Sequence, residues 1–202
     1  MRKRLLAVVC AACLLMLHAG CQNSGDDRID SSVRDSGSAA SGYSVELTLE
    51  GQPERVIYTP IASSTYPYTI GVDETRFAFG HSDDEDIDVI AYLPGDNDGG
   101  LSARISIFFQ PAPTESEDDF MLQAAEMLRS IDYTVGQEES VQVGSGNDPG
   151  RRILADDGSV SQEFYCIPYG DESVIINLTY PSEGAEGVAE RMRHMLTTLE
   201  LR

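Results

Sequence analysis

The sequence predicts an α+β fold in which one antiparallel sheet is covered by two main helices. Short runs of alternating apolar and polar residues follow one another between turn residues, which is typical of antiparallel strands. Two other segments, near residues 120–131 and 185–199, place apolar residues at helical spacing instead. Helices that cover an antiparallel sheet give the α+β class.

The strands are expected in two groups. Tyr43, Val45, Leu47 and Leu49 alternate with polar residues, and residues 55–59 return after the turn at 51–54, so this part predicts a hairpin. Further short strands are expected at 66–72, 75–79, 88–93 and 103–110. A second group, at 139–143, 151–155, 160–168 and 173–180, reads as an antiparallel meander with turns at 147–150, 156–159 and 170–171.

Each predicted helix has a start signal and one apolar face. Residues 114–117 form a capping box, and Asp118 and Asp119 add favourable charge at the positive end of the first helix. Ser182 is the expected N-cap of the second helix. Its apolar face should pack on the sheet, while Arg191 and Arg193 should face water. The two apolar faces are Phe120, Ala124, Met127, Leu128 and Ile131, then Ala185, Val188, Met192, Met195, Leu196 and Leu199.

The N-terminus carries an export signal. Arg2, Lys3 and Arg4 precede an apolar run at residues 5–17, which is too short to span a bilayer, and small residues follow. The sequence Ala19-Gly20-Cys21 resembles the lipobox of bacterial lipoproteins, although His18 stands where leucine is usual. This resemblance implies that residues 1–20 are a signal peptide and that Cys21 receives palmitate-type acyl chains. It also implies attachment to the extracytoplasmic face of the cell membrane.

The remainder of the chain divides into a tether and a single domain. Residues 21–42 contain few aliphatic side chains, so they cannot offset their ordering entropy and should be disordered. Residues 43–202 are long enough to form one α+β domain with a substantial core. Cys166 is the one cysteine in that segment, in an apolar strand, which favours a buried side chain over a nucleophile.

The charge balance is strongly acidic. The chain has 34 acidic and 14 basic residues, a formal charge of −20, and loss of residues 1–20 would remove three basic residues and make it −23. A polyanion without a basic stripe is unsuited to nucleic acid. It is also repelled by anionic head groups, so membrane contact should come from the lipid on Cys21.

The order of elements resembles the PsbP-like fold. The resemblance rests on Tyr66-Pro67-Tyr68-Thr69-Ile70, a long helix, a meander that ends in residues 174–181, and a last helix that runs into Leu199-Glu200-Leu201. It covers about residues 43–202. Members of that fold mostly act as binding or assembly factors, which implies a role of this kind by analogy.

The sequence holds no catalytic or nucleotide-binding signature, so a catalytic role is not expected. The acidic loop is the one candidate metal site, because Asp84, Asp86 and Asp88 have the alternate spacing of the first ligands of a calcium loop. Val89 occupies the position of the required glycine, and Gly95 that of the bidentate glutamate. A solvated loop is therefore the expectation, with weak calcium binding as the alternative.

Two functions follow as hypotheses. The first is a membrane-tethered module that binds or assembles an unidentified protein partner. The second is a lipoprotein that binds a small solute or calcium, with a sensory role. An exposed apolar patch would favour the first, and a pocket with convergent polar groups would favour the second.

Overall fold

The computed structural model describes residues 42–49, 51–93, 102–113, 119–183 and 186–202. All of them belong to one unit of the chain, Ala40–Arg202. The predicted signal peptide, Cys21, nearly all of the predicted tether and the capping box at 114–117 lie outside the described residues. No helix among the described residues is long and apolar enough to span a bilayer.

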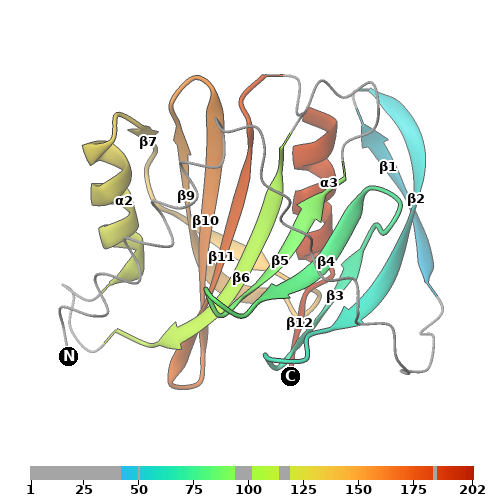
Figure 1. Ribbon diagram of the computed structural model, residues 1–202, viewed down its shortest axis with the longest axis horizontal. Coiled ribbons are helices and arrows are strands. Elements are labelled where there is room, and N and C mark those ends of the chain that lie inside the picture. The colour runs from blue at the N-terminus through green and yellow to red at the C-terminus, as the bar shows by residue number, and fades with distance from the viewer. Residues whose placement is uncertain (1–41, 50, 94–101, 114–118, 184–185) are drawn as a thin grey trace. The chain divides into compact units, whose positions relative to one another are not determined.

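The described residues contain two antiparallel sheets (Figure 1). The smaller sheet has the order β1-β2-β3-β12, with β1 at Tyr43–Leu49, β2 at Gln52–Ala62, β3 at Tyr68–Val72 and β12 at Glu200–Leu201. Its first two strands are a hairpin in which Tyr43 lies opposite Tyr58 and Leu49 opposite Gln52. The chain end returns as β12 to pair with β3.

The larger sheet has the order β4-β5-β6-β11-β10-β9-β7, and β8 also pairs with β9. Every pairing in it is antiparallel. Its strands are β4 Phe77–Ser82, β5 Ile87–Tyr92, β6 Arg104–Pro111, β7 Thr134–Val135, β8 Glu139–Val143, β9 Asp148–Asp156, β10 Val160–Tyr169 and β11 Glu172–Pro181.

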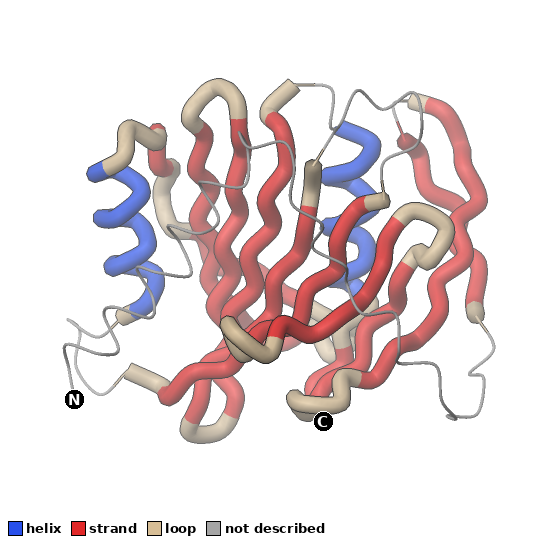
Figure 2. The backbone as a smooth tube through the Cα atoms, viewed as in Figure 1, coloured by secondary structure: helices blue, strands red, loops and turns tan. Residues whose placement is uncertain are grey.

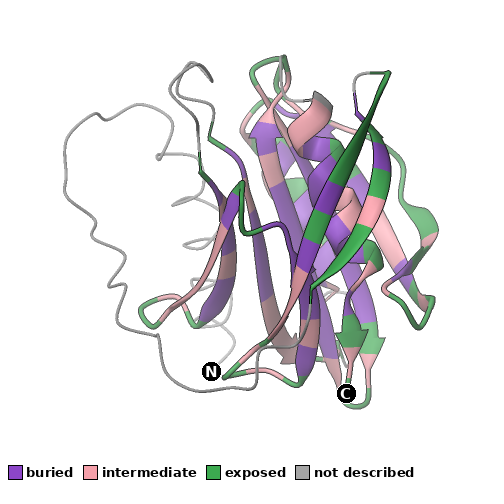
Figure 3. Ribbon diagram, turned by 90° about the vertical axis from the view of Figure 1, so that its right-hand side faces the viewer, coloured by how far each residue is buried: buried purple, intermediate pink, exposed green. Residues whose placement is uncertain are grey.

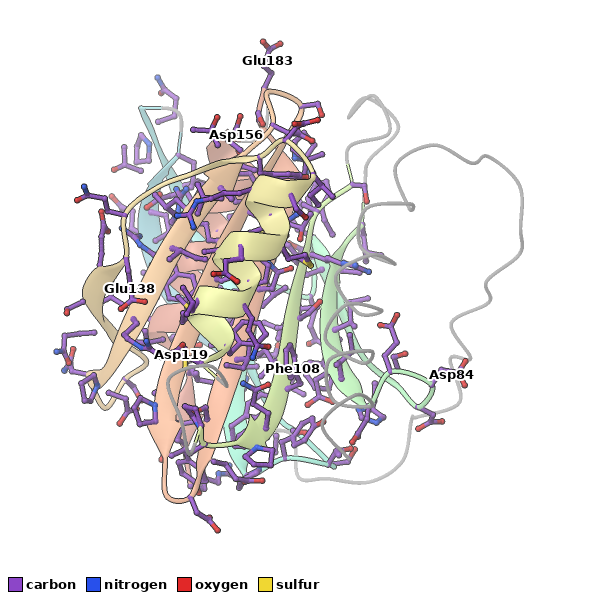
Figure 4. The ribbon with its side chains drawn as sticks, turned by 90° about the vertical axis from the view of Figure 1, so that its left-hand side faces the viewer. Asp84, Phe108, Asp119, Glu138, Asp156 and Glu183 are labelled. Atoms are coloured by element: carbon purple, nitrogen blue, oxygen red, sulfur yellow. The ribbon has the colours of Figure 1, made fainter. Side chains whose placement is uncertain are left out.

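The two helices lie on opposite faces of the larger sheet. Helix α2, Phe120–Ser130, contacts β7, β9 and β10 (Figure 4). Phe120 packs against Phe164 of β10. Helix α3, Glu186–Thr197, contacts β1, β3 and β11. Its buried residues share a core with Tyr165, the next residue along β10. Since successive residues of a strand point to opposite faces, α2 and α3 are on different sides.

The main core lies between the smaller sheet, one face of the larger sheet, and α3. Inward residues of β1 and β2 are buried while their neighbours are exposed, so bands of both kinds alternate along these strands (Figure 3). The α3 residues Met192, Met195, Leu196 and Leu199 are all buried in this core, as the helical spacing predicts.

The predicted α+β class, a PsbP-like arrangement with two main helices over one antiparallel sheet, is wrong. Strand accounts for 56% and helix for 15% of the structure, in two sheets (Figure 2). The physical reason lies at Asp73, whose side chain and carbonyl accept hydrogen bonds from residues 75–77. This turn sends β3 and β4 into separate sheets, so the smaller sheet joins α3 on a face of the larger sheet that a helix alone was expected to cover.

The individual elements agree better with the sequence. Both helices form, and Asp119 is the N-cap of α2, with its carboxylate accepting from the Met121 N–H. The turn predicted at 147–150 is misplaced: the chain reverses at 144–147, where Gly144 and Asn147 adopt positive φ, and β9 begins at Asp148. The two-residue strands β7 and β12 are too short to produce a periodic pattern.

Candidate functional site

The acidic loop does not gather its three aspartates around one point. Asp88 is buried on β5, where it accepts hydrogen bonds from the Tyr68 hydroxyl at 2.6 Å and pairs with His81 Nδ1 at 2.8 Å. Asp86 lies in the β4–β5 turn with positive φ. Asp84 is exposed at the tip of that turn, away from α2 (Figure 4).

The pairing of His81 with Asp88 has a local origin. The two residues face each other across the antiparallel β4–β5 hairpin. The other ring nitrogen, His81 Nε2, is 3.8 Å from Asp83 and 3.9 Å from Asp86. Among the described residues, no group of three or more His, Cys, Asp or Glu side chains is arranged to hold a metal ion. In this hairpin, the Asp88 carboxylate therefore orients the His81 ring beside a polar turn.

A cavity of about 400 Å³ lies at the C-terminal end of α3, and we call it the α3 cavity. The smaller sheet forms one of its walls, through Tyr43 of β1, Pro60 of β2, and Thr69 and Gly71 of β3. Gly71 matters here because a Cβ at this position would lie 2.7 Å from the Tyr43 hydroxyl and 3.0 Å from Thr198 Oγ1. The glycine therefore lets the Tyr43 and Thr198 side chains pack directly against β3 at the cavity wall.

The other wall comes from the end of α3 and the segments that dock on it. It consists of His194 and Thr197 of α3, Thr198, Glu200 of β12, and Ser145 of the β8–β9 turn. At this helix end the Thr197 hydroxyl donates to the His194 carbonyl at 2.7 Å, and the Thr198 hydroxyl donates to the Met195 carbonyl at 2.6 Å. These bonds satisfy carbonyls that a helix end leaves open.

The turn between β8 and β9 is held against the same helix end. The Ser145 N–H donates to the Leu199 carbonyl at 2.8 Å, and the Ser145 hydroxyl donates to the same oxygen at 3.3 Å. Gly144 has φ of 75°, and a Cβ there would lie 2.4 Å from that carbonyl oxygen. A glycine is therefore required where the hairpin closes on α3.

Two polar atoms of the cavity-lining residues are buried without a hydrogen-bond partner in the described part of the chain. They are Thr69 Oγ1 and His194 Nδ1. Burial lowers the pKa of His194, and the opposing effect of Glu190 is smaller, so the neutral ring is favoured. The His194 ring stacks on Tyr58 with ring centroids 5.1 Å apart. Buried polar groups normally have partners, so these two atoms leave hydrogen-bonding capacity unused within residues that line the cavity.

Two arginines of α3 hold the helix in position, against the expectation that both face water. Arg191 is 6% exposed and contacts the buried Asp73 at 2.8 Å and also Glu54. Arg193 is 40% exposed in its side chain and binds the buried Glu163 at 2.7 Å. The helical pattern identified the apolar face correctly. It missed these ion pairs because Asp73 and Glu163 are far from α3 in sequence.

Cys166 is buried, as predicted. Its sulfur lies 3.8 Å from Arg151, whose guanidinium binds Asp119, the N-cap of α2. The thiol therefore belongs to the packing between α2 and the larger sheet, away from the α3 cavity.

Sequence reasoning did not find the α3 cavity, because its lining residues come from separate segments between Tyr43 and Glu200. One local signal was present. A turn was predicted next to Gly144-Ser145-Gly146, at 147–150, and the structure shows that the actual turn at 144–147 supplies Ser145 to the cavity wall. No sequence pattern linked it to His194.

Comparison with known proteins gives no family. No protein-family model and no curated protein matches the chain. Among solved structures, the Ran-binding protein Mog1p of Saccharomyces cerevisiae is similar with 13% identity and a TM-score of 0.49, over 71% of this chain and 95% of Mog1p. A protein of Bacteroides thetaiotaomicron is similar with 14% identity and a TM-score of 0.38, over 71% of this chain and 48% of that one. Similarity this low transfers no function.

Proposed function

We propose that this protein is an exported lipoprotein, held by acyl chains on Cys21 to the extracytoplasmic face of the cell membrane, that binds a small polar solute in the α3 cavity. The α3 cavity, with its unpartnered polar atoms, is the observation that carries the proposal. The proposed role is binding, with a sensory or delivery function at the membrane, and includes no catalytic step.

The anchor is supported by the sequence. The basic N-terminus, the apolar run at 5–17 and Ala19-Gly20-Cys21 occur in the order that export and lipidation require. Two or more acyl chains give a lasting attachment, and each buried CH₂ contributes about 0.8 kcal/mol. The polar segment that follows Cys21 is suited to hold a domain away from the bilayer.

Solute binding is supported by the size and chemistry of the α3 cavity. Small-molecule sites occupy about 300–1,000 Å³ and contain a few convergent polar groups. The α3 cavity has a volume of about 400 Å³ and is lined by hydroxyls, an imidazole and a carboxylate. These groups come from both the smaller sheet and α3, so the fold holds them in place without a ligand.

A protein-binding or assembly role draws less support from the described surface. Its large exposed apolar side chains lie on separate segments of the chain, namely Tyr43, Ile57, Leu93, Leu122 and Leu154. Tyr43 and Ile57 occupy neighbouring strands, but their alternation places them on opposite faces of the smaller sheet. Protein interfaces favour contiguous apolar patches, so the α3 cavity is the better candidate site.

A screen of small polar fragments against the full-length protein in detergent tests the proposal. Binding in the α3 cavity should perturb the NMR signals of the His194 ring and leave those of His81 unchanged. Gly71→Ala should weaken the binding of any hit, because the new Cβ would displace the Tyr43 and Thr198 side chains of the cavity wall. The matched control is Gly80→Ala, whose Cβ has nothing within 4 Å.

Calcium binding to the acidic loop is tested separately, by thermal melting. Both carboxylate oxygens of Asp88 already have partners within the protein. We therefore expect about 1 mM calcium to change the melting temperature no more than magnesium does. A calcium-specific rise that Asp86→Asn abolishes would favour the acidic loop as the binding site. If no fragment perturbs His194, the proposal of a solute site at the α3 cavity is wrong.

A further inference from the structure

We propose that the ligand of the α3 cavity is a small organic cation that donates N–H hydrogen bonds, such as a primary amine. This inference rests on the proposed function and specifies the chemistry of the same site. It follows from three properties of the cavity: the direction of its hydrogen bonds, its charge, and its unpartnered atoms.

The hydroxyl groups at the helix end have already used their protons. Those of Thr197, Thr198 and Ser145 each donate to a backbone carbonyl at the C-terminal end of α3. Each hydroxyl has one proton and two lone pairs, so what remains for a ligand is acceptor capacity. Thr198 Oγ1 also accepts from the Gly71 N–H at 2.7 Å, which leaves Ser145 and Thr197 as the more available acceptors.

The charge around the cavity favours a cation. Glu200 is the one carboxylate among the described residues that line it, and none of these residues is Lys or Arg. The cavity also lies at the C-terminal end of α3, where the helix dipole places partial negative charge. The net charge of the chain, −20, attracts cations to the protein and repels anions.

The unpartnered atoms fit the same ligand. A neutral imidazole presents a lone pair on one ring nitrogen, and a threonine hydroxyl can accept as well as donate. Thr69 Oγ1 and His194 Nδ1 therefore both have unused acceptor capacity, which a ligand N–H reaches only if these buried atoms shift toward the cavity. Tyr43 adds an aromatic ring to the cavity wall, and such a ring also attracts cations. An anion would meet the charge of Glu200 with only neutral O–H and N–H donors, and no Lys or Arg of the described lining, to balance it.

Four compounds of one length test the inference by calorimetry on the full-length protein. They are 5-amino-1-pentanol, its N-trimethyl derivative, 1,5-pentanediol and 5-hydroxypentanoate. The primary amine should bind at least about tenfold more tightly than the diol or the acid, since a hydrogen bond between charged partners is worth that much. The N-trimethyl compound should bind more weakly than the amine, because it has no N–H.

Two variants locate the effect. Glu200→Gln keeps the shape of the side chain and removes its charge, and it should weaken amine binding about tenfold. Glu183 precedes the N-terminal end of α3, opposite the cavity (Figure 4). Glu183→Gln also removes one negative charge, and it should change the affinity for the amine less than twofold. Equal melting temperatures of the two variants without ligand would show that the fold is intact.

The outcomes separate this inference from the proposed function. If the diol or the acid binds as tightly as the amine, and Gly71→Ala weakens that binding, the cavity is a solute site but the cation inference is wrong. Equal effects of Glu200→Gln and Glu183→Gln, tight binding of the N-trimethyl compound, or binding of none of the four would also overturn it. The fragment screen at His194 decides the proposed function independently.

Discussion

Glu163 and His194 show how the surroundings of a single buried residue set its charge. The Glu163 carboxylate on β10 is fully buried and accepts hydrogen bonds from Tyr180 at 2.6 Å, Tyr165 at 2.7 Å and Arg193 at 2.8 Å. Burial opposes its charge, but these donors outweigh burial and hold its pKa below the usual value. His194 has an unpartnered ring nitrogen, and burial lowers its pKa. Glu163 therefore stays charged, whereas the neutral form of His194 is favoured.

The lowered pKa of Glu163 predicts part of the acid sensitivity of the protein. The unfolded chain takes up the proton near the ordinary value of 4.5, before the folded state does. The contribution of Glu163 to stability is thus complete above that pH and is lost as pH falls through its folded pKa. Glu163→Gln should cost about 3 kcal/mol at pH 7 and make the loss of stability below pH 5 shallower.

Urea unfolding at several pH values measures this effect. The control is Glu138→Gln, which changes a carboxylate that is 45% exposed and 3.4 Å from Arg151. It should keep the steep acid dependence of the wild type, because exposed pairs contribute little. An unchanged pH slope in Glu163→Gln would show that its carboxylate is not the charged, hydrogen-bonded group described above.

At the scale of elements, α3 connects the parts of the fold. It contributes buried residues to the main core and contacts both sheets. Arg191 ties it to the β3–β4 turn, and Arg193 ties it to β10. Its C-terminal end leads into β12 and supports the β8–β9 turn. The position of α3 therefore fixes where β12 and the β8–β9 turn, which supply part of the wall of the α3 cavity, are held.

Two substitutions on α3 test its packing. Leu196 is 3% exposed, so Leu196→Ala should lower the free energy of unfolding by about 2–5 kcal/mol through lost burial and a cavity. Glu190→Ala, on the exposed side of the same helix, should change it by no more than about 0.5 kcal/mol. Chemical denaturation of both variants gives the comparison. Losses of similar size would contradict the core position of Leu196.

At the scale of the whole molecule, the chain combines a basic, apolar N-terminus with a strongly acidic remainder. All 34 acidic residues follow Cys21, whereas three of the 14 Lys and Arg residues precede it. Tethered copies with this charge repel one another and repel anionic lipid. The membrane attachment we propose therefore depends on acylation of Cys21 and gains nothing from the surface charge of the domain.

Replacement of the proposed anchor residue tests the membrane attachment. Cys21→Ser removes the thiol that would accept the lipid, so the variant should incorporate no labelled palmitate and should accumulate as an uncleaved or mislocated precursor. Cys13→Ser, within the apolar run, is the matched control and should be labelled like the wild type. Continued labelling of Cys21→Ser would show that another residue carries the lipid.

Local sequence patterns predicted most of the elements correctly. The β1–β2 hairpin, the meander from β8 to β11, and both helices appear close to where alternation and helical spacing placed them. These features depend on neighbouring residues, which the sequence shows directly. The turn at 144–147 was predicted three residues too far along the chain, at 147–150, because Asn147-Asp148-Pro149-Gly150 also consists of turn-forming residues.

The alternation of the strands, the apolar faces of the helices and the acidity of the chain can all be read from the amino-acid sequence, since each is a property of neighbouring residues or of composition. The placement of β3 and β4 in different sheets, the burial of Arg191 on Asp73, and the hydrogen bond from Tyr68 to Asp88 follow instead from the tertiary structure. It also brought Tyr43, Ser145 and Glu200 to one cavity. These outcomes depend on contacts between residues distant in sequence, which no local pattern encodes.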